Sequence, residues 1–254
     1  RDRDVTGVQT CALPISYWTQ KRTNFVILTS KNLLIHFMNK KESSDNMRIR
    51  NIKNADEIIK NNKYIIENPE KYQGHFQELF GNNNEIHLEI GMGKGNFLIS
   101  KALNNPSINF IGLEKYTSIV ARAVKKLENL DLPNLKIING DALNLNNMFA
   151  KEISAIYLNF SDPWPKARHS KRRLTSDTFL KIYDDIFKNE CTIFQKTDNT
   201  GLFESSIISL TNYGYKISDI SLDLWSTDKF YEETEYERKF KNKGIKINYL
   251  KATK

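Results

Sequence analysis

The chain has 254 residues, of which 39% are hydrophobic and 27% are charged, and this composition excludes fibrous, collagen-like and disordered proteins. The longest apolar stretch, residues 25–38, is interrupted by Lys31 and is shorter than the roughly 20 residues that span a bilayer, so we expect no membrane partner. A net charge of +8 suits a polyanionic partner but also occurs in proteins without one. Two cysteines, Cys11 and Cys191, are too few for a disulfide framework and lack metal-ligand spacing, so we expect a cytoplasmic protein that binds no metal.

Residues 1–46 differ from the rest of the chain because they show no sustained helical or strand period, and we expect them to be unstructured. Residues 1–16, which read RDRDVTGVQTCALPIS, resemble a translated sequencing adapter. We therefore expect this leader to be non-native, the natural protein to begin at Met47, and residues 47–254 to form a single domain. A signal peptide is the alternative, but its apolar segment contains a lysine and no small-residue cleavage site follows.

The first predicted element after Met47 is a helix over Ala55–Asn68, in which four isoleucines lie near helical spacing and which Pro69 ends. Short apolar runs then alternate with amphipathic stretches, and we predict strands at residues 86–90, 108–113, 135–138, 155–160 and 192–195, with helices between them. This alternation indicates an α/β fold with a parallel sheet covered on both faces. The runs at residues 216–224 and 245–250 predict that the sheet ends in an antiparallel pair.

In open α/β sheets ligands bind outside the carboxyl ends of the strands, and the first predicted strand ends in a glycine-rich turn. Glu89 is followed by Gly91, Gly93 and Gly95, and the missing Cβ atoms let the backbone approach a ligand closely. The G-x-G-x-G spacing disfavours a pyrophosphate-binding dinucleotide site. Taken alone, the same residues also fit a tight turn that binds nothing.

Carboxylates follow the next two predicted strands. Glu114 is placed to accept hydrogen bonds from both hydroxyls of a ribose, and Asp141, followed by Ala142, is placed to meet an adenine amino group. A single carboxylate at a strand end is commonly a helix cap. Two of them after a glycine-rich turn favour an adenosine-containing ligand without a pyrophosphate, and S-adenosylmethionine fits that description.

The fourth strand end, SDPWPK, has the most specific sequence. Two prolines stiffen the loop after Asp162, and Trp164 offers a ring for a stacked base or a packed neighbour. A run of cations follows at residues 166–173, either as a solvated face or as phosphate contacts that deliver a nucleic acid. Asp198, after the fifth strand, is either a functional carboxylate or the N-cap of a helix near Gly201, and residues 234–237 also fit a capping box.

Taken in order, the segments LEIGMGKGNFL, IGLE, NGDA, YLNFSDPWPKARHSKRRL, KTDN and TEYERKF resemble the bacterial tRNA (guanine-N7)-methyltransferase family from about Met47 to the last residue. The resemblance implies a Rossmann-like class I methyltransferase fold: a mostly parallel seven-stranded sheet with helices on both faces and an antiparallel C-terminal strand. It also implies methyl transfer from S-adenosylmethionine to N7 of a guanine in the tRNA variable loop. The partner would be tRNA, and the protein would be a monomer or a homodimer.

The same resemblance implies the roles of individual residues. The predicted contacts of S-adenosylmethionine are Glu89, Gly91, Gly93, Gly95, Glu114, Asp141, Ala142 and Asp162. Asp162 is also the predicted catalytic residue. The predicted substrate contacts are Lys166, Asp198, Thr234, Glu235, Tyr236 and Glu237. The predicted tRNA contacts are Arg168, His169, Ser170, Lys171, Arg172 and Arg173.

Three other functions remain open from the sequence. One is a class I methyltransferase that acts on a protein or a small molecule, for which the cation run would be incidental. Another is a nonenzymatic tRNA-binding subunit, which the intact glycine turn and carboxylates disfavour. An NAD-linked dehydrogenase fits only the first two strand ends.

Overall fold

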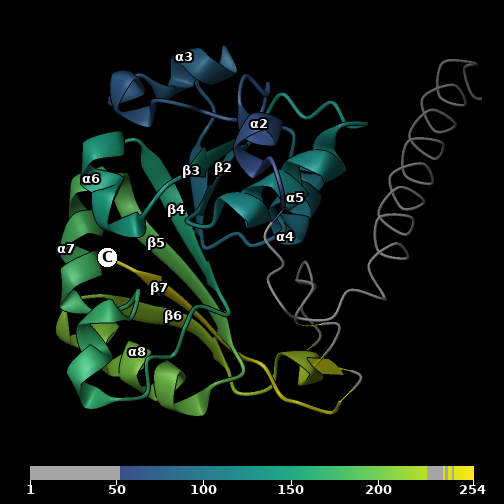
Figure 1. Cartoon of the computed structure of the whole chain (residues 1–254). Coiled ribbons are helices and arrows are strands. Elements are labelled where there is room, and N and C mark those ends of the chain that lie inside the picture. Colours follow the sequence, from purple (N-terminus) through teal and green to yellow (C-terminus); the bar gives the residue numbers. More distant parts are fainter. Residues whose placement is uncertain (1–51, 228–236, 238–239, 242) are drawn as a thin grey trace, which may run out of the picture. The chain divides into compact units, whose positions relative to one another are not determined.

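The computed structural model describes residues 52–227, 237, 240–241 and 243–254, which belong to one compact unit (Figure 1). The leader of residues 1–46 lies outside the described residues, as do the predicted substrate contacts Thr234, Glu235 and Tyr236.

A seven-stranded sheet forms the centre of this unit. Its strands are β1 (Ile86–Ile90), β2 (Asn109–Glu114), β3 (Leu135–Asn139), β4 (Ile153–Asn159), β5 (Phe187–Thr197), β6 (Lys216–Ser221) and β7 (Asn248–Thr253). The spatial order is β3-β2-β1-β4-β5-β7-β6. Strands β1 to β5 are parallel, and β7 runs antiparallel to both β5 and β6, so the predicted α/β sheet with an antiparallel end is confirmed.

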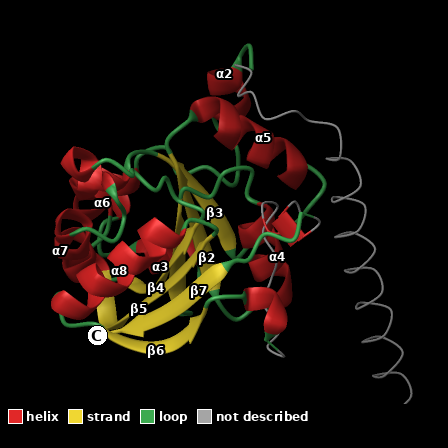
Figure 2. Ribbon diagram, turned by 90° about the horizontal axis from the view of Figure 1, so that it is seen from below, coloured by secondary structure: helices red, strands yellow, loops and turns green. Residues whose placement is uncertain are grey.

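Helices cover both faces of the sheet, with α4 and α5 on one side and α6, α7 and α8 on the other (Figure 2). The α-helices with described bounds are α2 (Ala55–Ile59), α3 (Phe76–Phe80), α4 (Asn96–Asn104), α5 (Thr117–Leu127), α6 (Leu145–Met148), α7 (Asp177–Ile186) and α8 (Thr200–Asn212). Short 3₁₀ helices are η1 (Pro69–Tyr72), η2 (Ala142–Asn144), η3 (Ala167–Arg172) and η4 (Leu224–Ser226). Among the described residues no helix has the length and apolar character needed to cross a membrane.

The main hydrophobic core lies between the sheet and the helices α6, α7 and α8. Leu88 of β1 and Ile156 of β4 are fully buried there against Leu180 and Tyr183 of α7 and Phe203 of α8. Because β1 and β4 have helices on both faces, none of their residues is exposed, and even the polar His87 and Glu89 of β1 are half-buried and buried. This burial holds the carboxyl ends of β1 and β4 in fixed positions, side by side.

The predicted helix over residues 55–68 is wrong beyond Ile59, where α2 ends. Asn61 has a φ of 55°, in the left-handed region, which interrupts a helical path. Ile65 instead forms a parallel bridge with Ile137 of β3, and the backbone of Ile137 exchanges hydrogen bonds of 2.7 and 2.9 Å with Tyr64 and Ile66. This segment therefore satisfies backbone groups along the edge of β3 that would otherwise be unpaired.

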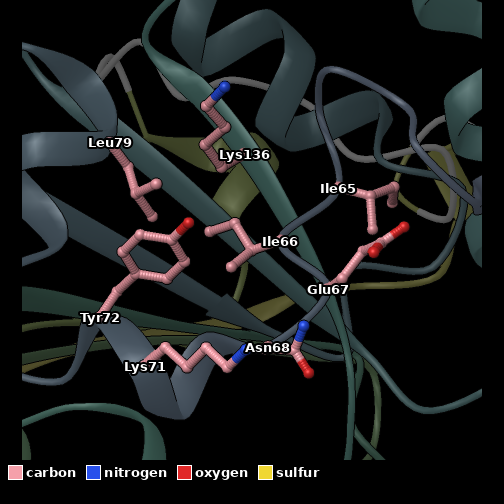
Figure 3. Close-up of a pocket in the computed structure, with 8 residues that line it drawn as sticks. All are labelled: Ile65, Ile66, Glu67, Asn68, Lys71, Tyr72, Leu79 and Lys136. Carbon is pink, nitrogen blue, oxygen red and sulfur yellow. The ribbon is translucent and has the colours of Figure 1, made fainter.

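A pocket lies beside this edge strand and is shown in Figure 3. Its lining comes from residues 65–72, α3 and β3: Ile65, Ile66, Glu67, Asn68, Lys71, Tyr72, Leu79 and Lys136. Lys136 is near the amino end of β3, and its Nζ donates to the carbonyl of Lys63 at 2.8 Å. Because ligands of open α/β sheets bind at the carboxyl ends, we assign this pocket no part in the main site.

Gly112 in β2 provides a test of how tightly the sheet packs against the first glycine-rich loop. A Cβ atom at this position would lie 2.2 Å from Sδ of Met92 and 2.8 Å from Cδ2 of Leu98, both of which are buried. We expect Gly112→Ala to lower the free energy of unfolding by about 1–3 kcal/mol, measured by urea denaturation. As a control, Gly201→Ala in α8 places its Cβ 3.6 Å from the nearest side-chain atom and should be neutral or slightly stabilising. Equal stability of the two variants would contradict this account.

Candidate active site

A crevice opens where the order of the strands reverses, between β1 and β4. The chain continues from β1 to β2 on one side and from β4 to β5 on the other, so the loops after β1 and β4 diverge. A pocket at this point is lined by Glu89, Gly91, Met92, Gly93, Lys94, Gly95, Asn96, Phe97, Asn159 and Phe160. The predicted glycine turn and the start of the predicted active-site loop therefore meet in one pocket.

The glycine turn adopts a backbone that other residues rarely take. Gly91, Gly93 and Gly95 have φ values of 75°, 56° and 74°. A Cβ atom at Gly91 or Gly93 would meet nothing within 4 Å, so the space above the turn is open. The turn thus needs glycine for its backbone conformation, and it leaves room for a ligand.

Glu89 is a buried carboxyl at the floor of the crevice, with an exposed fraction of 2%. Its Oε1 accepts a hydrogen bond of 2.8 Å from Nδ2 of Asn159, which joins the ends of β1 and β4. Its Oε2 is buried with no hydrogen-bond partner among the described residues. Burial raises the pKa of Glu89 to about 8, against the opposing effects of Asn159 and the Lys196 charge. An orphaned acceptor beside a pocket is a group that a ligand donor would satisfy.

Glu114, at the end of β2, holds the glycine turn. Its Oε2 accepts the backbone N–H of Gly93 at 3.0 Å, and its Oε1 accepts the backbone N–H of Tyr116 at the same distance. Each carboxylate oxygen has a further lone pair, so two ligand hydroxyls remain within its capacity. Glu114 therefore both shapes the turn and presents acceptors beside it.

Asp141 follows β3 and caps η2, as the capping alternative predicts. The backbone N–H of Leu143 donates to its Oδ1 at 3.0 Å, and Nζ of Lys115 lies 2.8 Å from its Oδ2. These two contacts hold the pKa of Asp141 below its usual range. The adjacent Ala142 is half-buried.

Two exposed apolar side chains after strands β2 and β3 were not predicted from the sequence as site residues. Tyr116 and Leu143 have exposed fractions of 57% and 53%, and each lies two residues after a predicted carboxylate, Glu114 or Asp141. They occupy equivalent positions after these adjacent strands, and this shared spacing is the sequence pattern that could have identified them. Exposed apolar groups at neighbouring strand ends suit the faces of a flat ring.

The loop after β4 is held in an unusual conformation. Phe160 and Trp164 have positive φ values of 52° and 41°, which cost about 1–3 kcal/mol each in a bulky residue. The backbone N–H of Phe160 donates to the carbonyl of Lys196 at 2.8 Å, which fixes the start of the loop to β5. Asp162 and Lys166 follow as exposed side chains.

The predicted cation run forms η3 and packs on Trp164. The guanidinium of Arg172 lies 4.9 Å from the centre of the Trp164 ring, and the His169 ring meets it edge-on at 5.7 Å. Arg168 and Lys171 are exposed, whereas Ser170 and Arg173 are half-buried. Trp164 therefore packs against the cation run, which agrees with the packed-neighbour alternative.

A buried ion pair lies next to the crevice. Nζ of Lys196 is 2.9 Å from Oε1 of Glu237, and the two side chains are 6% and 0% exposed. Nζ of Lys196 also lies 5.6 Å from the centre of the Phe97 ring, which lines the pocket. Glu237, a predicted substrate contact, is therefore buried against β5, and Lys196 is a site residue that the sequence analysis missed.

Asp198 is exposed and does not cap the following helix. The cap of α8 is Asn199, whose Oδ1 accepts the backbone N–H of Leu202 at 2.7 Å. The capping alternative for Asp198 is therefore wrong, because α8 begins at Thr200 and the residue that precedes it is Asn199. Its predicted contact with substrate stays a prediction.

The raised pKa of Glu89 predicts a pH dependence of stability. Its pKa moves from an ordinary 4.5 to about 8 in the folded protein, so between these values the native state binds more protons than the unfolded chain. The free energy of unfolding should therefore fall as pH rises through this window. We expect Glu89→Gln to remove part of that fall in urea denaturation from pH 4.5 to 8. The exposed Glu190→Gln should keep the wild-type profile, and identical profiles for all three proteins would refute the assignment.

The buried pair of Lys196 and Glu237 predicts strong coupling. Lys196→Met removes the cation from a fully buried carboxylate and should lower the free energy of unfolding by as much as about 3–5 kcal/mol. The double variant Lys196→Met/Glu237→Gln should recover part of this loss, since it leaves no buried charge at the pair. A double-mutant cycle by urea denaturation measures the coupling. Strictly additive effects would show that the pair does not act as a unit.

Comparisons with known proteins agree with this geometry. A family model described as "Putative methyltransferase" matches residues 83–250. A tRNA (guanine-N(7)-)-methyltransferase of Bacillus cytotoxicus is 47% identical over 211 residues, which cover 81% of this chain and 96% of that protein. A protein of the same name from Lachnoclostridium phytofermentans is 46% identical, over 81% of this chain and 98% of its own.

Solved structures show the same fold at low sequence identity. An antibiotic-related methyltransferase has a TM-score of 0.54 and 18% identity, over 71% of this chain and 92% of its own. A 16S rRNA methyltransferase has a TM-score of 0.52 and 15% identity, with the same coverage. The expected Rossmann-like class I methyltransferase fold is thereby confirmed. Together with the relatives that are 46% and 47% identical over 81% of the chain, this places the chain in the tRNA (guanine-N7)-methyltransferase family.

Proposed function

We propose that this protein transfers a methyl group from S-adenosylmethionine to N7 of a guanine in the variable loop of tRNA, acting in the cytoplasm. The observation that carries the proposal is the similarity to two tRNA (guanine-N(7)-)-methyltransferases over 96% and 98% of their lengths. The arrangement of the crevice supports it, because the residues that the resemblance singles out lie on neighbouring strand ends.

The residues of the crevice fit S-adenosylmethionine. Glu114 would accept from the ribose hydroxyls, Asp141 from the adenine amino group, and the orphaned Oε2 of Glu89 from a further donor. The open space above Gly91 and Gly93 leaves room for the group to lie against the turn. When bound, S-adenosylmethionine supplies an electrophilic methyl group on a positively charged sulfur.

The reaction requires little acid–base chemistry from the protein. N7 of guanine carries an in-plane lone pair and no proton, so it attacks without a general base. The purine gains positive charge as the bond forms, and a carboxylate beside it stabilises that charge in the transition state. Asp162, exposed in the loop that starts at the pocket, would supply this carboxylate. Its position next to Pro163 restricts the backbone that carries it.

The exposed cations of η3 would bind the tRNA backbone. η3, which contains Arg168, Lys171 and Arg172, directly follows the loop of Asp162. Phosphates bound by these cations would therefore bring the variable loop of the tRNA to the crevice. Lys166 and Asp198, which are exposed, remain proposed substrate contacts, whereas Glu237 is buried in its ion pair with Lys196. The target guanine must leave its stack to reach the site, at a cost of a few kcal/mol.

The proposal is tested by incubating the full chain with S-adenosylmethionine and an unmodified tRNA transcript. Nuclease digestion and nucleoside mass spectrometry should then reveal 7-methylguanosine, and fragment mapping should place it in the variable loop. A transcript with adenine at that position is the control and should remain unmodified. Absence of 7-methylguanosine while S-adenosylmethionine still binds would overturn the acceptor and retain the cofactor.

The proposed role of Asp162 makes a separate prediction. Asp162→Asn removes the negative charge that favours the charged purine, so kcat should fall about 10²–10³-fold with little change in the affinity for S-adenosylmethionine. Methyl transfer to tRNA measures the first quantity, and calorimetry measures the second. Asp177→Asn, an exposed carboxylate at the start of α7, is the matched control and should keep wild-type activity. An equal loss of cofactor affinity in Asp162→Asn would move this residue into the cofactor site.

A further inference from the structure

Arg173 differs from the other cations of the run in what it contacts. It lies at the C-cap of η3, and its guanidinium reaches back to the active-site loop. Its Nε donates to the carbonyl of Pro163 at 3.2 Å, and a terminal nitrogen donates to the carbonyl of Trp164 at 3.1 Å. The side chain is half-buried, whereas Arg168 and Lys171 are exposed.

The segment that Arg173 contacts has few means of holding its own shape. Pro163 and Pro165 have no backbone N–H, so neither can donate a hydrogen bond. Trp164 between them has a φ of 41°, a conformation that persists in a bulky residue only when its surroundings enforce it. Two hydrogen bonds from one planar guanidinium to consecutive carbonyls are a constraint of that kind.

The ring of Trp164 is held by the same short helix. Residues three apart lie on one face of a 3₁₀ helix, and His169 and Arg172 share such a face. Both contact the Trp164 ring, at 5.7 and 4.9 Å. Arg173, directly after η3, therefore fixes the backbone of this turn, while His169 and Arg172 within η3 contact the Trp164 side chain.

We propose that Arg173 is a positioning residue that holds the loop of Asp162 in its reactive shape, and is not one of the tRNA phosphate contacts. The inference rests on the proposed function, in which the carboxylate of Asp162 faces the charged purine. Asp162 precedes Pro163 directly, so a change in the carbonyl direction at Pro163 moves that carboxylate. Arginine is needed because its rigid fork meets two carbonyls at once, whereas a lysine ammonium is a single point.

The decisive comparison is between Arg173→Lys and Lys171→Ala. Arg173→Lys keeps the charge and loses the fork, so kcat should fall about 10–100-fold, while KM for S-adenosylmethionine and Kd for tRNA stay within about twofold. Lys171→Ala should do the opposite: kcat at saturating tRNA is retained, Kd rises, and the log–log dependence of Kd on salt flattens by about 0.9. If Arg173→Lys keeps wild-type kcat, the proposal is wrong.

A second variant separates geometry from charge. Arg173→Ala should lose kcat, and added guanidinium should restore part of it, because the free ion can donate to both carbonyls. Ammonium at the same ionic strength should restore nothing. If Arg173→Ala instead keeps kcat and flattens the salt dependence as Lys171→Ala does, Arg173 is a phosphate contact and the proposal fails.

A third readout needs no substrate and therefore distinguishes this inference from the proposed function. In protein labelled with 5-fluorotryptophan, the fluorine resonance of Trp164 is assigned by Trp164→Phe. It should shift or broaden in Arg173→Lys and stay unchanged in Lys171→Ala. An unchanged resonance in Arg173→Lys would refute the positioning role of Arg173, even if the wild-type protein methylated tRNA. Failure of the wild-type protein to form 7-methylguanosine would refute the proposed function and leave this test intact.

Discussion

The hydrogen bond from Asn159 to Glu89 joins the two strands between which the crevice opens, and the rest of the site depends on it. A buried carboxyl is unfavourable unless its oxygens are satisfied, and Asn159 satisfies only one of them. The other oxygen remains for a ligand at the one place where the loops of the sheet diverge. The strand order thus places the unsatisfied oxygen of the buried Glu89 carboxyl where a ligand can bind to it.

Lys196 contributes to the balance of charge near the crevice. Lys196 pairs with Glu237 and also lowers the pKa of Glu89, although burial has the larger effect and leaves that pKa raised. A positively charged ligand beside Glu89 would favour its ionised form, so binding and proton release are linked. Because Lys196 lies in β5 and its carbonyl also accepts from Phe160, this strand supports both the charge and the loop of Asp162.

Features that depend on neighbouring residues were predictable, and those that depend on distant contacts were not. The five parallel strands follow from short apolar runs, and Glu114 and Asp141 were singled out because ligands bind at strand ends. Glu89 was singled out by the family resemblance. The isoleucines of residues 55–68 have helical spacing, yet two of them pair with the edge of β3, which the local sequence does not encode. Likewise, Lys196 meets Glu237 across 41 residues, a contact that no local pattern reveals.

The cation run shows why a uniform sequence can carry separate roles. As a string of charges, residues 168–173 suggest one surface, but η3 has a period of about three residues. This period places Arg168 and Lys171 together toward solvent and His169 with Arg172 against Trp164. Arg173, at the end of the helix, turns back to the loop it follows. A segment that binds phosphates on one face and holds the loop of Asp162 in place on another would couple tRNA binding to the conformation of the active-site loop.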